Sequence, residues 1–427
     1  MKYSVITFGC RVNQADSLGF EESFRAMGDV AVEPEHADLV VVNSCSVTGS
    51  ADQAVRQTVR RVVRQNPSVK VVVTGCYATR RPDEVGGLPN VIAIVPNERK
   101  DSLVRGVRLQ PDLHLTTAER FAGGDGSCGA AIEPGMAGRT AYTLRVQTGC
   151  TERCSYCIIP STRGTPRSVP LAEVLRQVAR VCDAGFREIV LTGVHLGSYG
   201  RDRSPAESLT GLLRALNSVA EARALAERVR FRISSLEPMD CTEAIVDLVA
   251  ASGAFAPHFH LPLQHASDRV LAAMRRPYTR ADYARLVDRI LDRMPGAAIG
   301  TDIIVGFPGE TDDDFRMLAE YLESSRLSHV HVFPYSDRPG TEAAVMQSKV
   351  APPVVRERGR VIREIGARLQ MRFRAAAVGT EHRALTLEDG SLVVTGNYLK
   401  ARIPPGHARN EWVRVRLTSE GEALVLT

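Results

Sequence analysis

Three closely spaced cysteines are the first residues in this sequence whose types and spacing could support chemistry. Cys150, Cys154 and Cys157 lie in the segment GCTERCSYC, which directly follows a predicted strand. Three thiolates at these spacings can bind three irons of a [4Fe–4S] cluster, which normally takes four thiolates, and so leave one iron open to a ligand. Zinc with a fourth ligand from elsewhere is the alternative, because CxxC pairs are common in zinc sites. Zinc sites usually use two ligand pairs, and the sequence has no second CxxC and no HxxH, but spacing alone leaves both metals open.

A second group of three cysteines is spread over the first part of the chain. Cys10, Cys45 and Cys76 each come just past the carboxyl end of a predicted strand, after VITFG, VVVNS and VVVTG. In a parallel sheet these ends share one edge, where doubly wound folds bind ligands. Packing or thiol chemistry would explain any one of them, since free cysteines are often buried. Because all three occupy the same topological position, we expect them to converge on one site.

The remaining cysteines do not follow this pattern. Cys182 lies among apolar residues and is predicted to pack in a core, Cys241 precedes a predicted helix, and Cys128 falls in a glycine-rich stretch. No catalytic role is predicted for any of the three.

The elements that would position the second group form a small doubly wound α/β domain over residues 1–108. Apolar runs at Tyr3–Phe8, Leu39–Val42 and Val69–Val73 predict buried parallel strands. Each run precedes a stretch with helical spacing, such as Ala51–Gln65, whose valines share one face.

The elements that would position the first group predict a larger α/β domain over residues 139–370, after a linker at 109–138. Six strand candidates, each followed by a helical pattern, suggest a partial (β/α)6 barrel or an open sheet. The strands expected are Tyr142–Gln147, Glu188–Thr192, Val229–Ser234, His258–Leu263, Ala298–Val305 and His329–Pro334. The helices expected include Leu171–Ala184, Glu243–Ala251, Asp312–Ser324 and Val354–Phe373.

The last segment, 371–427, changes to short strands separated by Gly and Pro turns, which predicts a small all-β domain, a five-stranded barrel or sandwich. The strands expected are Arg383–Leu387, Leu392–Thr395, Leu399–Ile403, Trp412–Leu417 and Ala423–Leu426.

Bulk composition narrows the class of protein. The chain has 427 residues, 44% hydrophobic and 24% charged, and a formal net charge of +5, which by itself decides little about a nucleic-acid partner. No apolar run is long enough to span a bilayer, and the start MKYSVITFGC lacks the features of a signal peptide. We therefore expect a cytoplasmic protein without a membrane partner. In a reducing compartment its nine cysteines favour metal ligation or packing over disulfides.

Together these motifs resemble the radical S-adenosylmethionine (radical-SAM) methylthiotransferases over essentially the whole chain. The Cys150-x3-Cys154-x2-Cys157 spacing resembles the radical-SAM signature, and the last domain resembles TRAM modules. The start GCRVNQ, the segment NSCSVT and RISSLEP (232–238) look most like the branch acting on N6-threonylcarbamoyladenosine (t6A) in tRNA. The matching segments are TFGCRVNQADS (7–17), VVNSCSVTGSAD (41–52), VVTGCYATR (72–80), GCTERCSYCIIPSTRG (149–164), LTGVHLGSYG (191–200), HLPLQHASD (260–268) and TDIIVGFPGET (301–311).

The resemblance implies a reaction and its cofactors. A [4Fe–4S] cluster on Cys150, Cys154 and Cys157 would bind S-adenosylmethionine and cleave it to a 5′-deoxyadenosyl radical, which takes hydrogen from C2 of the adenine at tRNA position 37. A second [4Fe–4S] cluster on the other three cysteines would hold or supply the sulfur, and a second S-adenosylmethionine would supply the methyl group. The partners implied are tRNA, a flavodoxin- or ferredoxin-like electron donor and a sulfur source.

Further cofactor contacts are expected at the carboxyl ends of the barrel strands. Thr192 and Gly193 take the place of the family's amino-group contact, and Glu237 could bind an ammonium or ribose hydroxyls. Helix capping, ion pairing and packing are the ordinary alternatives for these residues. The full set expected is Tyr156, Thr192, Gly193, Ser234, Glu237, Gln264 and Asp302. His265 departs from the small residue of many relatives, and we expect it to be structural.

Two basic regions are candidates for RNA binding. Residues 53–82 hold seven basic and no acidic side chains, and Arg56, Arg60 and Arg64 share one helical face. A solvated helix face is the usual explanation of such a stripe. In the tail, Lys400, Arg402, Arg414 and Arg416 are the candidates, with Arg414 and Arg416 on one face of a strand.

Three rival functions remain open at this point. The same chemistry could act on isopentenyladenosine in tRNA or on a ribosomal protein. A non-catalytic, metal-stabilised RNA-binding protein is the alternative of another class. Cysteines at the end of a barrel strand argue for an enzyme instead.

Overall fold

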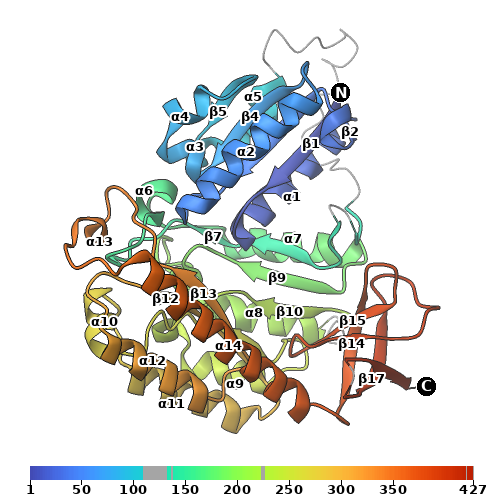
Figure 1. Cartoon of the computed structure of the whole chain (residues 1–427). Helices are drawn as coiled ribbons and strands as arrows, with labels where there is room; N and C mark the ends of the chain where they lie inside the picture. The colour runs from blue at the N-terminus through green and yellow to red at the C-terminus, as the bar shows by residue number, and fades with distance from the viewer. Residues whose placement is uncertain (109–131, 136–137, 223–226, 420, 427) are drawn as a thin grey trace. The chain divides into compact units, whose positions relative to one another are not determined.

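The computed structural model describes residues 1–108, 132–135, 138–222, 227–419 and 421–426 (Figure 1). The chain divides into two compact units. The first comprises Met1–Ile132, Thr148–Glu152 and Cys157–Thr165, and the second comprises Glu133–Gln147, Arg153–Tyr156 and Pro166–Thr427. The predicted linker at 109–138 lies almost entirely outside the described residues, as does Cys128.

A five-stranded parallel sheet forms the centre of the first unit. Its strand order is β2 (Val30–Ala31), β1 (Lys2–Thr7), β3 (Leu39–Ser44), β4 (Lys70–Gly75) and β5 (Val91–Val95). The register aligns Thr7 with Asn43 and Asn43 with Thr74, so the three predicted strands end level with one another. The predicted doubly wound α/β fold is confirmed, although the sequence prediction did not include β2 and β5.

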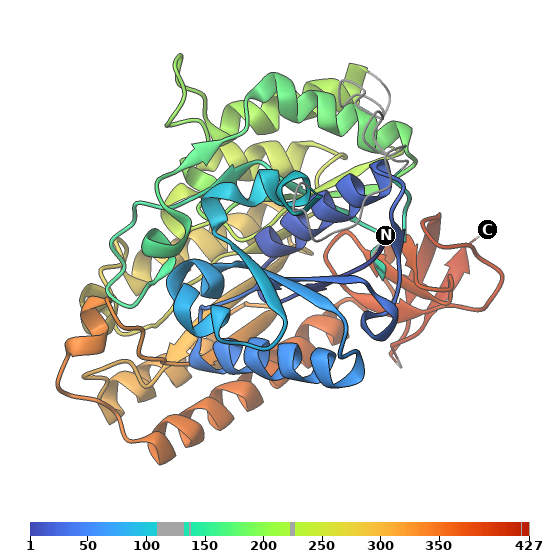
Figure 2. The same cartoon turned by 90° about the horizontal axis from the view of Figure 1, so that it is seen from above.

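Helices cover both faces of this sheet. Val40 and Val42 of β3 face α2 (Gly49–Gln65), α3 (Cys76–Arg80) and α4 (Pro82–Gly86). Leu39 and Val41 face the opposite way, towards α1 (Arg11–Ala26) and α5 (Leu103–Arg108). Figure 2 shows α1 and α2 on opposite sides of the strands. Alternate β3 residues therefore fill two cores, which explains the unbroken apolar runs of the sequence. The 3-10 helices η1 (Pro34–His36) and η2 (Asn97–Ser102) and the short helix α6 (Ile159–Arg163) complete the unit.

Six parallel strands form the partial barrel of the second unit. They make two three-stranded sheets, joined by bridges from Phe231 to Phe255 and from Ser235 to His260. The strands are β6 (Tyr142–Arg145), β9 (Glu188–Thr192), β10 (Arg230–Ile233), β11 (His258–His260), β12 (Ala298–Val305) and β13 (His329–Pro334). The two short strands β7 (Gln147–Thr148) and β8 (Arg167–Ser168) flank the cysteine segment in the sequence. The partial barrel is confirmed, and all six of its predicted strands are present.

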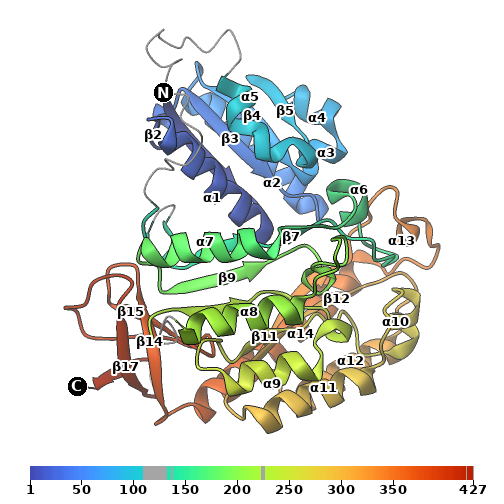
Figure 3. The same ribbon diagram turned by 180° about the vertical axis from the view of Figure 1, so that it is seen from behind.

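Helices line the outside of the barrel strands, and Figure 3 shows α7 beside β9. In α7, Val174, Val178 and Val181 form the buried stripe, as helical spacing predicts. Thr279 and Thr311 begin α11 and α12 with capping boxes. The longer helices are α7 (Leu171–Asp183), α8 (Leu209–Ala222), α9 (Glu243–Ala251), α11 (Arg280–Arg293), α12 (Asp312–Ser324) and α14 (Pro352–Ala376). The shorter ones are α10 (Asp268–Ala273), α13 (Glu342–Val345), η5 (Leu196–Ser198) and η6 (Pro238–Asp240). None of the described helices combines the length and apolar character needed to cross a bilayer.

The tail forms one five-stranded antiparallel sheet, and α14 leads into it. Its strand order is β16 (Lys400–Arg402), β15 (Leu392–Thr395), β14 (Glu381–Leu387), β17 (Trp412–Leu417) and β18 (Ala423–Leu426). A bridge from Arg402 to Glu422 brings the two edges together, so the sheet curls as a barrel does instead of packing as a sandwich.

This tail sheet packs on the amino-terminal end of the barrel strands. The indole of Trp412 donates to the Arg228 carbonyl at 2.9 Å, just before β10, and Asn397 donates to the Gly296 carbonyl at 2.9 Å, before β12. The carboxyl ends of the same strands lie at the other end of the barrel and remain available for a site.

Candidate active site

The three cysteines of the first unit meet at the carboxyl edge of its sheet. Cys10 is the residue before α1, Cys45 follows β3, and Cys76 begins α3 directly after β4. Ser44 and Gly75, the residues before Cys45 and Cys76, are paired in the sheet, and Gly9, before Cys10, lies against the Cys45 side chain. The expected convergence is therefore observed. Cys10 also lies at the amino terminus of a 16-residue helix, whose dipole favours negative charge.

Two glycines beside these cysteines allow close approaches that a side chain would block. Gly9 has φ of 85°, and a Cβ there would lie 2.6 Å from Cys45 Sγ. Gly75, beside Cys76, has φ of 97°, and a Cβ there would collide with the backbone of Ser44. Both positions require the left-handed region that only glycine adopts at no cost. A side chain at position 9 would collide with the Cys45 side chain.

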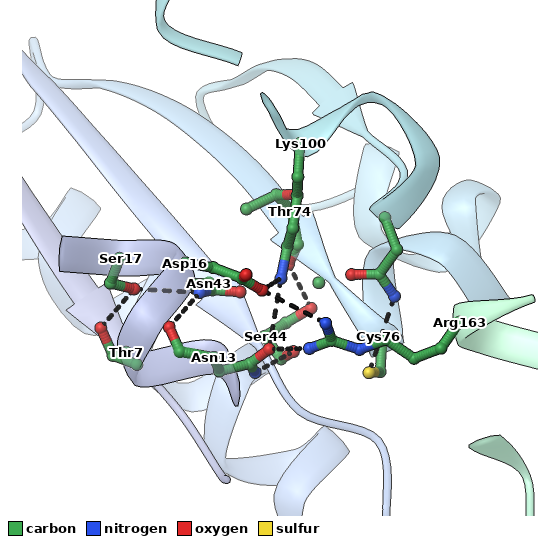
Figure 4. Close-up of polar contacts among 12 residues, drawn as sticks. Thr7, Asn13, Asp16, Ser17, Asn43, Ser44, Thr74, Cys76, Lys100 and Arg163 are labelled. Atoms are coloured by element: carbon green, nitrogen blue, oxygen red, sulfur yellow. Dashed lines mark hydrogen bonds and ion pairs between the residues drawn. The ribbon is translucent and has the colours of Figure 1, made fainter. Parts of the chain in front are cut away.

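A buried polar network lies against Cys76 (Figure 4). Lys100 Nζ lies 2.7 Å from Asp16 Oδ2, and Arg163 Nη1 lies 3.3 Å from the same oxygen. Lys100 donates to Asn13 Oδ1 at 3.2 Å, and Arg163 also donates to that oxygen. Lys100 is 1% exposed and Arg163 3%. Asn97 completes the surroundings, with its amide nitrogen 3.7 Å from Cys76 Sγ and 2.7 Å from the Thr162 carbonyl.

The network acts on the thiol of Cys76. Burial alone would raise the pKa of Cys76, but the positive charges of Arg163 and Lys100 outweigh it and hold the pKa below its usual value. Burial raises the pKa of Cys45 to about 11. Metal ligation needs thiolates. Three converging thiols, one of them with a lowered pKa, beside a helix amino terminus and buried cations, therefore fit the electron-rich cluster that the sequence predicts.

The first cysteine group, Cys150, Cys154 and Cys157, is divided between the two units. In the first unit, the Cys150 amide donates to the Gly164 carbonyl at 3.0 Å, and the Glu152 amide donates to Cys150 Sγ at 3.4 Å. Gly149 has φ of 79°, and a Cβ there would collide with the backbone of Thr165. The segment before Cys150 thus depends on glycine. Cys157 belongs to the same unit and directly precedes α6.

In the second unit, Cys154 is bound by a residue that the sequence analysis did not identify. Arg276 Nη1 donates to Cys154 Sγ at 3.2 Å, and its other terminal nitrogen forms an ion pair with Glu237. Arg276 Nε donates to Tyr278 at 2.9 Å, which fixes the guanidinium. Arg276 therefore links Cys154, a predicted cluster ligand, to Glu237, a predicted cofactor contact. The sequence offered only the RRPYT segment, which has no metal-ligand spacing.

The predicted cofactor residues on β9 and β10 lie together at the carboxyl ends of these strands. Ser234 Oγ lies 3.3 Å from Thr192 Oγ1, and both residues are buried. A Cβ at Gly193 would lie 2.9 Å from Gln147 Oε1, so the backbone approaches closely there. Gln147 in turn accepts from the His195 amide at 2.9 Å, and His195 pairs with Asp240 at 2.8 Å. Gln147, His195 and Asp240 were not among the predicted site residues.

Asp302 lies in a different environment from these residues. Its carboxylate contacts His260 Nε2 at 3.0 Å and His331 Nδ1 at 3.3 Å. Burial alone would raise the pKa of Asp302, but hydrogen bonds from the two histidines outweigh it and hold the pKa below its usual range. Within the structure Asp302 therefore belongs to a histidine pair on the barrel strands.

The last predicted cofactor residues have mainly backbone and packing roles in the structure. Gln264 has φ of 70° and exchanges backbone hydrogen bonds with Asp302 and Ile304, at 2.8 and 2.9 Å. Tyr156 packs against the core that includes Met274 and Phe307.

His265 is fully buried. Its Nδ1 accepts from the Ser267 amide at 2.9 Å, and burial lowers its pKa to about 4. A neutral imidazole that orders a turn is the structural role that we expected.

The basic residues predicted to bind RNA differ in their availability. Arg60 and Arg64 are exposed on α2, whereas Arg56 donates to the Tyr77 hydroxyl at 2.8 Å and is half-buried. In the tail, all four candidates are exposed on alternate residues of β16 and β17, which confirms that Arg414 and Arg416 share one face. Both arginines pair with Glu381, at 3.3 and 2.6 Å, so part of their charge is neutralised.

Comparison with known proteins identifies the family. Residues 144–322 match the Radical SAM superfamily, and residues 2–96 match a family described as uncharacterized protein family UPF0004. The chain is 35% identical to the threonylcarbamoyladenosine tRNA methylthiotransferase MtaB of Aquifex aeolicus, covering 93% of this chain and 96% of that protein. The chain belongs to the radical-SAM methylthiotransferase family. This methylthiotransferase is also 35% identical to MtaB of Bacillus subtilis, over 82% of this chain and 77% of that protein.

More distant relatives agree with this assignment. The methylthiotransferase is 32% identical to the tRNA-2-methylthio-N(6)-dimethylallyladenosine synthase of Thermobifida fusca, over 90% of this chain and 78% of that protein. Its fold is similar to that of the radical S-adenosylmethionine methyltransferase TsrM of Kitasatospora setae, solved with cobalamin and a [4Fe–4S] cluster bound. The TM-score is 0.56 at 15% identity, covering 81% of this chain and 77% of that one. The family uses S-adenosylmethionine and two [4Fe–4S] clusters, and the enzyme transfers a methylthio group.

Proposed function

We propose that this enzyme adds the methylthio group to C2 of t6A at position 37 of tRNA, next to the anticodon. The observation that carries the proposal is the 35% identity to the MtaB protein of Aquifex aeolicus over 93% of the chain, together with the convergence of Cys10, Cys45 and Cys76. That similarity extends over 93% of this chain and 96% of the Aquifex aeolicus protein.

We assign the two clusters to the two cysteine groups. Cys150, Cys154 and Cys157 would hold the cluster whose open iron binds S-adenosylmethionine, and Cys10, Cys45 and Cys76 would hold the auxiliary cluster. When bound, the first cluster supplies the electron that cleaves S-adenosylmethionine to a carbon radical. Arg276 would orient Glu237 towards the bound cofactor, because the guanidinium is held by Tyr278 and Cys154 on its other sides. Thr192, Gly193 and Ser234 would contact the cofactor's polar groups at the same strand ends.

The proposal extends to partners. Exposed basic residues would neutralise tRNA phosphates, namely Arg60 and Arg64 on α2 and the four basic residues of β16 and β17. Such contacts favour binding because they release the counterions condensed on the RNA. A flavodoxin- or ferredoxin-like protein would supply electrons, a separate sulfur source would serve the auxiliary cluster, and the reaction would take place in the cytoplasm.

The test is a reconstituted reaction read by nucleoside mass spectrometry. Protein loaded anaerobically with iron and sulfide is incubated with S-adenosylmethionine, a reductant and tRNA carrying t6A. We expect a methylthio adduct on t6A, absent from the Cys154→Ala variant. An adduct only on tRNA carrying isopentenyladenosine would move the enzyme to that branch of the family. Production of 5′-deoxyadenosine without an adduct on either tRNA would overturn the tRNA proposal and favour a ribosomal protein as substrate.

A further inference from the structure

The site around Cys76 buries more positive than negative charge. Lys100 and Arg163 are both almost completely buried, and among the described residues they share the single carboxylate of Asp16. A buried charge without a counter-charge costs several kcal/mol, so chains rarely keep one unless something compensates it. One positive charge in this network therefore needs a further anionic partner.

The neutral members of the network cannot supply that partner. Asn13 turns its oxygen towards both cations because its nitrogen is fixed by the Phe8 carbonyl at 2.7 Å and the Ser44 carbonyl at 3.0 Å. The amide satisfies hydrogen bonds but carries no net charge. Arg163 is also attracted by Cys76, through charge and a side-chain hydrogen bond, and by Cys10, through charge. The excess positive charge of this network therefore lies beside the cysteine site.

The auxiliary cluster has the charge that fits this excess. An oxidised [4Fe–4S] core carries two positive charges and three thiolates carry three negative ones, so the assembly is negative by one unit. Reduction adds one electron to the core, makes or breaks no bond, and doubles that negative charge. A neighbouring buried cation stabilises the reduced form more than the oxidised form.

We propose that Arg163, assisted by Lys100, is a positioning residue for the auxiliary cluster whose buried charge compensates the cluster and raises its reduction potential. The inference rests on the assignment of Cys10, Cys45 and Cys76 to that cluster in the proposed function. Asp16 opposes the effect by holding both cations and neutralising one of them. Asn97 and Asn13 fix the geometry without contributing charge.

The position of Arg163 in the chain adds a consequence. Arg163 ends α6, which begins two residues after Cys157, and the same segment is held by the bonds from Asn97 to Thr162 and from Cys150 to Gly164. The segment that carries two predicted ligands of the S-adenosylmethionine cluster therefore also delivers the main cation of the auxiliary site. Ordering of this segment sets the charge around the auxiliary cluster.

The experiment is a redox titration of the auxiliary cluster, monitored by electron paramagnetic resonance. The sample is the full chain with the Cys154→Ala substitution, which removes the signal of the S-adenosylmethionine cluster, and it contains no tRNA. We expect Arg163→Gln to lower the equilibrium constant for one-electron reduction by dithionite roughly tenfold, which is a shift of about 59 mV to lower potential. Lys100→Gln should shift it in the same direction. Asp16→Asn should shift it in the opposite direction, because it removes a negative charge.

Two controls separate charge from fold. Arg163→Lys keeps the charge, so its reduction potential should stay near that of the parent. Arg61→Gln removes an equal charge from an exposed position on α2, where solvent screens it, and should leave the reduction potential unchanged. Unchanged potentials in cluster-loaded Arg163→Gln and Asp16→Asn, or shifts of the same sign in both, would overturn the inference. If Arg163→Gln does not load iron, the opposite signs expected for Lys100→Gln and Asp16→Asn decide it.

The outcome is independent of the substrate. A methylthio adduct on another nucleoside would overturn the proposed function and leave these potentials as expected. Iron-loaded protein that loses no cluster signal on replacement of Cys10, Cys45 or Cys76 by Ala would overturn the ligand assignment, and with it this inference.

Discussion

Both units of the molecule bury two cations against one carboxylate, yet they handle the surplus charge differently. In the second unit, Arg230 and Arg232 share Glu188, with Arg230 Nη2 at 2.6 Å and Arg232 Nη2 at 3.0 Å from the same oxygen. In the first unit, Lys100 and Arg163 share Asp16. All six side chains are almost fully buried. The two networks therefore have the same charges and similar burial, and differ only in what surrounds them.

The surplus in the second unit is satisfied within the protein. Arg232 donates to the Gly396 carbonyl at 2.9 Å and lies over the Tyr398 ring at 4.6 Å from its centroid. Arg230 lies over the Trp412 ring at 4.9 Å. Carbonyl oxygens and aromatic faces stabilise a cation without an opposite charge. This cluster fastens the tail sheet to the barrel, whereas the surplus in the first unit faces cysteine sulfur and no described aromatic ring.

The largest effect is expected from Glu188→Gln, which leaves two buried arginines without a counter-charge. Breaking a buried ion pair from one side costs about 3–5 kcal/mol. Urea denaturation followed by tryptophan fluorescence measures it, because the single tryptophan, Trp412, lies at this junction. The reduction potential of the auxiliary cluster should not change in this variant. A change of less than about 1 kcal/mol would show that the junction does not depend on the carboxylate.

The Glu188 carboxylate should also make the free energy of unfolding depend on pH in acid. Burial alone would raise the pKa of Glu188, but Arg232 and Arg230 outweigh it and lower the pKa to about 2. A carboxyl whose folded pKa is depressed contributes stability that is present above its unfolded value, about 4.3, and is lost as the pH falls towards the folded value. The free energy of unfolding should thus fall between about pH 4.5 and 2, and this part of the fall should be absent from Glu188→Gln. Parallel acid titrations of both proteins would contradict the assignment.

The two units also show how much of the site could be predicted from the sequence. Strand-end positions predicted the convergence of Cys10, Cys45 and Cys76, because topology alone brings parallel strand ends together. Asn13, Asp16 and Arg163 lie inside the segments that resemble the family, but nothing in their spacing indicated a shared network. Their meeting depends on side-chain reach across elements distant in sequence, which periodicity does not encode.

The second unit gives a similar lesson. The strands of the barrel followed from their apolar runs, but the carboxyl end of β11 was predicted too late, at Leu263 instead of His260. Pro262 interrupts the pairing with β12, which resumes as a bridge at Gln264. Proline cannot donate to a strand ladder. Arg276 was missed because a lone arginine in a loop has no periodic partner; only the fold brings it to Cys154 and Glu237.

A smaller effect is expected when an aromatic face is removed. Tyr398→Leu keeps an apolar side chain but removes the ring beneath Arg232, which should lower the free energy of unfolding by about 1 kcal/mol. Arg232 keeps Glu188 and the Gly396 carbonyl, so the fold should survive. Tyr398→Phe is the matched control, since it retains the ring and should unfold at nearly the parent urea concentration. An equal loss in both variants would assign the effect to the hydroxyl.

The smallest effect, and the one that most sharpens the comparison, is expected for Arg163→Gln in metal-free protein. Without the cluster, this change removes the surplus buried charge and leaves Lys100 paired with Asp16, so the free energy of unfolding should not fall. Arg232→Gln, which removes a cation that the protein itself satisfies, should cost more in the same metal-free state. Urea denaturation of both variants, with circular dichroism as the probe for both units, makes the comparison. A loss in Arg163→Gln as large as in Arg232→Gln would mean that the Asp16 network stabilises the fold by itself, and that its two cations need no cluster to compensate them.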